Sequence, residues 1–242
     1  MPNTTLALIT GANKGIGFET ARRLGQQGIH MLIGARDRAR GEEAVQKLAA
    51  LSVQATFVEL DVTDEMSIAQ AAQSLADRFG RLDILINNAG ISGGNANTPS
   101  DTTLSVMRTV YDINVFGVVA VTKAMLPLLR KSAIGRIVNV SSGLGSITQA
   151  SDKHYEFFQF NNLPYQSSKA AVNAITVAFA KELAGTPIKV NAADPGFTNT
   201  DFNNHRGSRT VEQAATVIVH LATLGEDGPT GSFQDENGNI PW

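Results

Sequence analysis

Cysteine is absent from the 242 residues of this chain, which excludes disulfide frameworks, thiolate metal sites and cysteine nucleophiles. A formal net charge of −2 gives no general attraction to nucleic acid or to anionic lipid. We expect no membrane span, because the longest apolar run, Ile113 to Thr122, ends at Lys123 and is shorter than the ~18 residues required. The start, Met1 to Thr5, lacks the layout of a signal peptide. These absences predict a cytoplasmic protein with no nucleic-acid or membrane partner.

What is present is an alternation of short apolar segments with longer helical patterns. Strands are expected at Leu6–Thr10, Ile29–Gly34, Val53–Leu60, Ile84–Asn87, Arg136–Ser141 and Ile188–Ala192. Helices are expected at Gly15–Gln27, Arg38–Leu51, Asp64–Phe79, Leu104–Arg130 and Ser167–Ala184, and loops at Ser92–Ser100 and Thr198–Arg209. Strands separated by helices predict a parallel sheet covered on both faces. Without a repeat or linker, residues 1–242 are interpreted as one doubly wound α/β domain.

A glycine-rich turn, Thr10 to Gly17, joins the first strand to the first helix. Glycines allow a tight turn and let backbone N–H groups and the helix N-terminus approach a pyrophosphate. Many glycine-rich turns bind nothing, but this position between strand one and helix one favours a nucleotide site. The first fifty residues also carry seven basic and four acidic side chains, which suits an anion.

The end of the second strand distinguishes NADP from NAD. An acidic residue there would bind the adenosine ribose, whereas a basic one accommodates a 2′-phosphate. Here Arg36 follows the strand directly, Arg40 lies one helical turn further on, and Lys14 sits in the glycine-rich turn. Asp37 would oppose a phosphate, but we expect it to cap the following helix and point away. The sequence therefore favours NADP(H).

Tyr165 and Lys169 are four residues apart, so on a helix they share one face. An unperturbed tyrosine has a pKa near ~10. A cation ~4 Å from the phenolate at an effective dielectric constant of ~20 would lower that pKa by up to ~3 units. The pair would then serve as an acid and base near neutral pH. The same spacing often arises by chance, so alone it does not establish catalysis.

In combination these motifs resemble the short-chain dehydrogenase/reductase family over essentially the whole chain. The matching segments, in chain order, are Thr10–Gly17, Asp61-Val62, Asn87–Gly90, Asn114, Val140–Ser142, Tyr165 with Lys169, and Pro195-Gly196. The resemblance implies a Rossmann-type fold. The most similar subgroup is the NADPH-dependent carbonyl reductases, which share Asn13-Lys14-Gly15, Arg36 and Arg40 with this chain.

The family implies a role for each matched residue. Tyr165 would protonate a carbonyl oxygen, Lys169 would lower the tyrosine pKa and hold the nicotinamide ribose, Ser142 would bind the substrate oxygen, and Asn114 would hold a water that resupplies protons. Contacts to NADP(H) are expected from Gly11, Asn13, Lys14, Gly15, Ile16, Gly17, Arg36, Arg40, Asp61, Val62, Asn88, Ala89, Gly90, Tyr165, Lys169, Pro195, Gly196, Thr198 and Thr200. No metal is expected, because the four histidines show no ligand spacing.

The function implied is NADPH-dependent reduction of a small ketone or aldehyde to an alcohol. A 3-oxoacyl or hydroxysteroid reductase would share the same catalytic residues, and an NADP-sensing regulator would usually lack the tyrosine or the lysine. Two departures from the family pattern are Asp194, before Pro195, and Thr198 in place of valine or isoleucine.

The segment Gln149–Asn162 is longer than in most members and holds four aromatic residues, Tyr155, Phe157, Phe158 and Phe160. We expect it to cover the outer face of the following helix, line the substrate pocket with its rings, and favour a monomer narrowly over a dimer. The loop from Asn203 to Arg206 is expected to be solvated rather than to border the substrate, and Trp242 to fix the C-terminal tail.

Overall fold

A computed structural model describes residues 4–94 and 98–242; residues 95–97 of the loop expected at 92–100 lie outside them. One sheet has its strands in the order β3-β2-β1-β4-β5-β6-β7-β8. The first seven strands are parallel, and β8 is antiparallel to β7. The strands are β1 Leu6–Thr10, β2 His30–Ala35, β3 Ala55–Glu59, β4 Ile84–Asn87, β5 Arg136–Val140, β6 Lys189–Ala193, β7 Phe233–Asp235 and β8 Gly238–Asn239.

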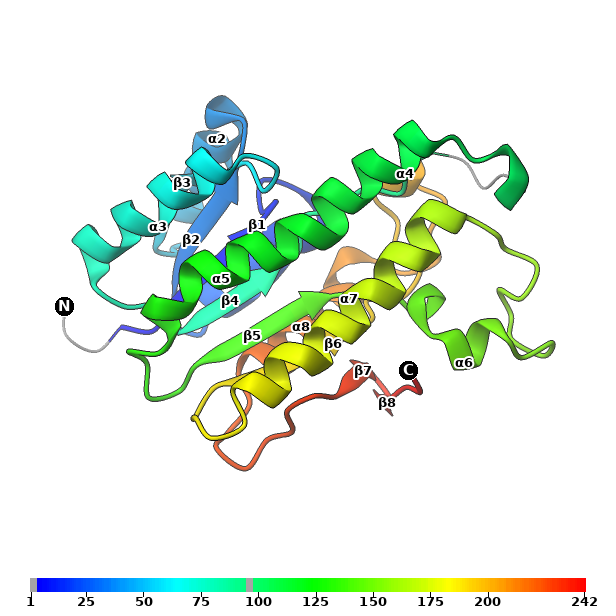
Figure 1. The fold of residues 1–242 in the computed structure, drawn as a ribbon. Helices are drawn as coiled ribbons and strands as arrows, with labels where there is room; N and C mark the ends of the chain where they lie inside the picture. Colours follow the sequence, from blue (N-terminus) through cyan, green and yellow to red (C-terminus); the bar gives the residue numbers. More distant parts are fainter. Residues whose placement is uncertain (1–3, 95–97) are drawn as a thin grey trace.

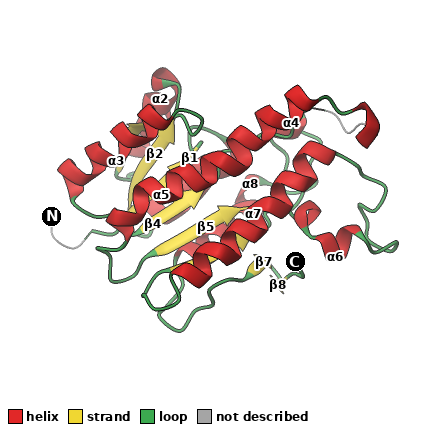
Figure 2. Ribbon diagram, viewed as in Figure 1, coloured by secondary structure: helices red, strands yellow, loops and turns green. Residues whose placement is uncertain are grey.

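Helices cover both faces of the sheet, as Figures 1 and 2 show. Helices α3, α5 and α7 pack on one face, and α1, α2 and α8 on the other. Their bounds are α1 Gly15–Gly25, α2 Arg38–Ala50, α3 Glu65–Phe79, α4 Leu104–Tyr111, α5 Gly117–Leu129, α6 Ile147–Ala150, α7 Leu163–Glu182 and α8 Val211–Ala222. This is the doubly wound, Rossmann-type arrangement that the sequence predicted.

The alternation of side chains along β1 divides the core between the two faces. Ala7 and Ile9 join the cluster under α1, α2 and α8, whereas Leu6 and Leu8 join the cluster under α3, α5 and α7. All four are buried, so the strand is apolar on both faces, as a central parallel strand requires. The two apolar layers fix the position of the strand ends, where the candidate site lies.

Helix α7 begins four residues earlier than the sequence predicted. Asn162 caps it by accepting a hydrogen bond from the backbone N–H of Tyr165 at 3.2 Å, and Pro164 occupies its first turn, where a missing N–H costs nothing. Tyr165 and Lys169 therefore both lie within the helix. Helix α8 and strands β7 and β8 were not predicted at all.

The expectation that no apolar segment reaches membrane length was wrong. Helix α4, a π-helical turn at Asp112–Phe116 and α5 form one helical run, Leu104–Leu129, that is long and apolar enough to cross a membrane by length and composition alone. Just over half of its most apolar window, 56%, is buried inside the protein. Val121, Met125 and Leu129 of this run belong to the core under the sheet, and a core helix passes the same test.

The segment 149–162 does not cover α7 as expected. It lies beside the N-terminal end of that helix in Figure 1, and the outer positions Ala174 and Ala178 of α7 are exposed. The short helix α6 is instead tied to the C-terminal tail, because the backbone N–H of Thr148 donates to the carbonyl oxygen of Trp242 at 3.1 Å. Trp242 stacks on Phe233, with the ring centroids 5.6 Å apart, so it fixes the tail as predicted. The monomeric state stays a prediction.

Candidate active site

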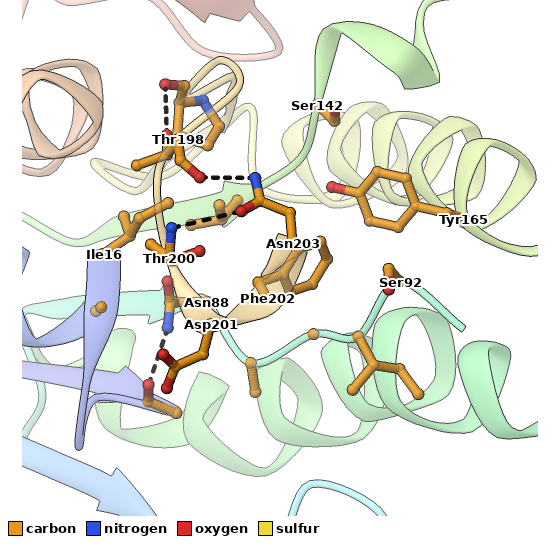
Figure 3. Close-up of a pocket in the computed structure, with 18 of the residues that line it drawn as sticks. Ile16, Asn88, Ser92, Ser142, Tyr165, Thr198, Thr200, Asp201, Phe202 and Asn203 are labelled. Carbon is orange, nitrogen blue, oxygen red and sulfur yellow. Dashed lines mark hydrogen bonds between the residues drawn. The ribbon is translucent and has the colours of Figure 1, made fainter. Parts of the chain in front are cut away.

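A cavity of about 1520 Å³ opens at the carboxyl ends of the parallel strands. This is the edge where open α/β sheets bind their ligands. Every residue that the sequence assigned to the site lines this cavity, with the exception of Asn114. Figure 3 shows Tyr165 with its hydroxyl directed into the cavity, between Ser142 and the loop that carries Thr198 to Asn203. Motifs that are far apart in the sequence therefore meet around one space.

The glycine-rich turn has the backbone that an anion site requires. Gly11 and Gly15 have φ values of +64° and +58°, in the left-handed region that favours glycine. Lys14 precedes α1 without capping it through its side chain, and the first turn of α1 contains no acidic residue. The N–H groups at this helix end are therefore not capped by the Lys14 side chain or opposed by a carboxylate of the first turn, which suits a pyrophosphate.

Two loops interlock behind this turn. The side-chain amide of Asn88 donates to the carbonyl oxygens of Thr10 at 2.9 Å and Gly11 at 3.2 Å. In return, the Thr10 hydroxyl accepts hydrogen bonds from the backbone N–H groups of Asn88 and Ala89, at 3.0 and 2.9 Å. A Cβ on Gly17 would lie 2.5 Å from the Asn88 amide nitrogen, so this close approach requires glycine. Sequence reasoning missed the contribution of Thr10.

The basic residues line the part of the cavity beside the ends of β1 and β2. We call this part the adenosine end, after the group of the cofactor that is expected there. Arg36 and Arg40 are exposed there, and Asp37 caps α2 as predicted, by accepting from the backbone N–H of Arg40 at 3.0 Å. Asp37 does not point away as expected, because it lines the cavity and its Oδ2 lies 3.7 Å from Arg40 Nε. Lys14 is engaged differently from our expectation, because its Nζ lies 2.7 Å from the carboxylate of Asp201. Of the three cations assigned to a 2′-phosphate, Lys14 alone is paired across the cavity.

Tyr165 and Lys169 project from α7 toward the end of β5. The Lys169 ammonium donates to the carbonyl oxygen of Val140 at 2.7 Å and lies 5.6 Å from the centroid of the Tyr165 ring. Ser142, two residues beyond Val140, accepts a hydrogen bond from the backbone N–H of Leu144 at 3.2 Å, which orients its hydroxyl. A phenol, a hydroxyl and an ammonium thus converge on one wall of the cavity.

Asn114 lies behind this wall, in the π-helical turn. Its side chain pairs with both backbone groups of Ile91 at 2.9 Å and donates to the Ser168 hydroxyl at 3.0 Å. A Cβ on Gly90 would lie 3.3 Å from the Asn114 oxygen and 3.7 Å from the Lys169 nitrogen, so both side chains approach Gly90 closely. Asn114 therefore connects the loop after β4 to α7. π-Helical turns of this kind are frequent at functional sites.

The pKa of Tyr165 shifts opposite to our expectation. Burial raises it above its ordinary value, the nearby carboxylate of Asp194 raises it further, and a hydrogen bond with Ser142 only partly opposes them. Lys169, whose ammonium donates to Val140 and lies over the Tyr165 ring, 5.6 Å from its centroid, does not offset this rise. Burial lowers the pKa of Lys169 to about 8.

The other end of the cavity is aromatic. Tyr155, Phe157 and Phe160 from the long segment line it together with Phe197 and Phe202 from the loop after β6. Phe157 meets Tyr155 and Phe197 edge-to-face, at centroid distances of 5.6 and 6.3 Å. The prediction of an aromatic lining is thus confirmed for three of the four rings.

Two expectations about this end need correction. Phe158 does not line the cavity and is exposed. The loop 203–206 is exposed at His205 and Arg206, as expected, but Asn203, His205 and Arg206 also line the cavity. This loop adds polar groups to one side of the opening.

Comparison with known proteins gives one consistent result. A family model described as short chain dehydrogenase matches residues 5–210. The chain is 42% identical over 226 residues to short-chain dehydrogenase anuI of Penicillium roqueforti, covering 91% of this chain and 89% of that protein. It is 32% identical over 276 residues to carbonyl reductase [NADPH] 1 of Bos taurus, covering 98% of each. The crystal structure of NADPH-bound carbonyl reductase from chicken fatty liver superimposes with a TM-score of 0.86 at 32% identity, covering 99% of this chain and 100% of that one.

Proposed function

This chain belongs to the short-chain dehydrogenase/reductase family, and from that premise we propose that it is an NADPH-dependent reductase of ketones and aldehydes. One observation carries the proposal. A single cavity joins the free N-terminus of α1, the arginines after β2, and the group formed by Ser142, Tyr165 and Lys169. An anion-binding end and a proton-donating end in one space suit a reaction between a dinucleotide and a small carbonyl compound.

The residues present fit NADP(H). The N–H groups at the start of α1 would hold the pyrophosphate, and Arg36 and Arg40 the 2′-phosphate, with Lys14 joining them if its pair with Asp201 opens. Lys169 would hold the nicotinamide ribose, and the segment from Pro195 to Thr200 would border the nicotinamide. When bound, this cofactor supplies the hydride. A preference of this chain for NADP(H) is supported by the bovine and chicken relatives, which are an NADPH carbonyl reductase and an NADPH-bound carbonyl reductase.

The chain's own groups supply the proton. Ser142 and Tyr165 would both hydrogen-bond the substrate oxygen and hold it at Tyr165 Oη. The raised pKa of Tyr165 keeps the phenol protonated at neutral pH, which is the form that a general acid needs. With a pKa of about 8, Lys169 is mostly charged at neutral pH, the form in which its ammonium would donate hydrogen bonds to the nicotinamide ribose. Asn114, linked to Ile91 and Ser168, would position the route that returns a proton from solvent.

The test is turnover of a broad panel of ketones and aldehydes, followed by the loss of NADPH absorbance, with NADH in parallel. We expect oxidation of NADPH that depends on the carbonyl compound, and much slower oxidation of NADH. Stoichiometric NADPH binding without turnover across the panel would instead indicate a cofactor sensor. A preference confined to 3-oxoacyl thioesters or to steroid ketones would assign the enzyme to one of those reductase classes.

A further inference from the structure

Asp194 places a carboxylate in the wall of the cavity without a cationic partner. It follows β6 directly, and its Oδ1 accepts a hydrogen bond from the backbone N–H of Gly196 at 2.9 Å. The backbone N–H of Gly143 also donates a hydrogen bond to the Asp194 carboxylate. Within residues 4–94 and 98–242, no lysine, arginine or histidine forms an ion pair with Asp194 within 4.0 Å.

The two cations that interact with Asp194 at longer range are engaged elsewhere. Lys169 donates to the carbonyl oxygen of Val140. The terminal nitrogens of Arg209 pair with both carboxylate oxygens of Glu236, at 2.5 and 2.6 Å, while its Nε is buried without a hydrogen-bond partner. Burial raises the pKa of Asp194, because desolvation disfavours the charged carboxylate more than its two backbone hydrogen bonds favour it. A cation delivered by a ligand would supply the missing compensation.

Oxygen atoms also gather beside this carboxylate. The position that a Cβ would take on Gly143 lies 2.9 Å from Asp194 Oδ2, 3.0 Å from the Tyr155 hydroxyl oxygen and 3.4 Å from Gln149 Oε1. Gln149 Oε1 is buried with no hydrogen-bond partner. A protonated amine carries N–H donors and no acceptor, so an amine is the complement of an oxygen-rich site.

The rings around Asp194 favour the same ligand. Tyr155, Phe157 and Phe197 line the cavity with Asp194 and form a continuous edge-to-face series. A carboxylate next to aromatic rings is a combination that attracts an organic cation, since the ring faces are electron-rich and the carboxylate carries the opposite charge. A neutral ligand in this place would leave the carboxylate desolvated and unpaired.

We propose that Asp194 binds a protonated amine of the substrate, so that the preferred ketones and aldehydes of this enzyme are amine-bearing cations. The inference rests on the proposed function for the carbonyl half of the substrate. Because Asp194 lines the same cavity as Tyr165, the amine and the reacting carbonyl belong to one molecule.

A matched pair of ketones tests the proposal. 4-(Dimethylaminomethyl)acetophenone is a cation at neutral pH, and 4-isobutylacetophenone has the same shape with CH in place of the nitrogen. We expect kcat/KM for the amine to exceed that for the neutral ketone by about tenfold or more. Asp194→Asn, which keeps an oxygen for the Gly196 N–H, should bring this ratio to about one. Asp77→Asn removes the same charge from an exposed position on α3 outside the cavity and should leave the ratio within about twofold.

Binding of the same two ketones, measured by calorimetry with NADP⁺ present, separates this inference from the proposed function. If neither ketone is reduced but the amine binds more tightly in an Asp194-dependent way, the reductase assignment fails and the cation site stands. If the wild-type ratio of kcat/KM for the amine to kcat/KM for the neutral ketone is near one, the cation site is overturned. That measurement requires no variant. A preference that persists in folded Asp194→Asn overturns it as well.

Discussion

The two ends of the cavity are built in different ways. The adenosine end is made of short segments that directly follow β1, β2, β3 and β4, and its basic side chains, Lys14, Arg36 and Arg40, are exposed. The aromatic end is made of long segments after β5 and β6 that pack on one another, with Tyr155 and Phe157 half-buried among them. The first end is fixed by the sheet, whereas the second depends on contacts between loops. Cofactor binding is therefore expected to tolerate changes at the aromatic end, and substrate choice to tolerate changes at the adenosine end.

The largest effect is expected where the two ends meet, at Tyr165. Tyr165→Phe keeps the ring on α7 and removes the hydroxyl, so kcat should fall by ~10²-fold or more while the Kd for NADPH changes little. Steady-state kinetics and a fluorescence titration with NADPH measure the two quantities. The control is Tyr111→Phe, a tyrosine that packs on Phe116 outside the cavity and should leave kcat unchanged. Near-native turnover in Tyr165→Phe would contradict the mechanism.

The second-largest effect tests whether the adenosine end sets cofactor choice independently of substrate binding. Arg36→Asp replaces a cation at the cavity edge by an anion, so the ratio of kcat/KM for NADPH to that for NADH should fall by ~10²-fold with little change in the KM for the carbonyl substrate. Arg38→Asp carries the same charge change two residues later. Arg38 pairs with Glu59 and does not line the cavity, so its substitution should leave the ratio within about threefold. If both variants lower the ratio for NADPH over NADH equally, the preference depends on the net charge of this region and not on the position of Arg36.

A smaller effect is expected at the aromatic end. Phe157→Ala removes the ring that contacts both Tyr155 and Phe197, so KM for a bulky aromatic ketone should rise by ~10-fold while the Kd for NADPH is unchanged. Phe158→Ala is the matched control, because the neighbouring ring points to solvent. If both variants raise KM equally, the segment moves in solution and its rings are not held as described.

The smallest effect concerns stability against pH. Burial lowers the pKa of Lys169 from 10.5 to about 8, so between about pH 8 and 10 the unfolded chain holds a proton that the folded protein has lost. The free energy of unfolding should therefore rise with pH in this window, by on the order of 1 kcal/mol per pH unit at most. The raised pKa of Tyr165 acts in the opposite direction only above about pH 10.

Urea denaturation at several pH values, compared between the wild type and Lys169→Met, isolates this contribution. The variant has no ammonium at position 169, so its free energy of unfolding should rise less steeply above about pH 8. Identical slopes would show that Lys169 keeps its ordinary pKa in the folded protein.

The difference between the two ends also explains what the sequence could predict. Motifs at the ends of parallel strands must meet at one edge of the sheet, so the placement of Gly11, Asn88 and Ser142 followed from the strand pattern. The contact between Asp194 and Gly143 depends on how two loops lie against each other, and no local pattern encodes it. The burial of Tyr165 likewise depends on how the surrounding segments pack, and it is the main reason why the pKa of Tyr165 was wrongly predicted.

Some elements were missed for simpler reasons. Helix α8 carried a recognisable start, because Thr210 and Gln213 form a reciprocal capping box, yet these residues follow a loop that we extended only to Arg209. Strands β7 and β8 have three and two residues, too few for an alternating pattern to be detected.

The close approach of Gly17 to Asn88 limits how freely the phosphate-binding turn could be moved between proteins. The turn spans eight consecutive residues, but Asn88, presented by a strand more than seventy residues further on, holds its carbonyl groups in place. A designer who transplants residues 10–17 onto another sheet would have to supply the asparagine, the neighbouring strand and the glycine opposite it together. The smallest portable unit is thus a pair of adjacent strands with both of their loops, and the short motif by itself is not a module.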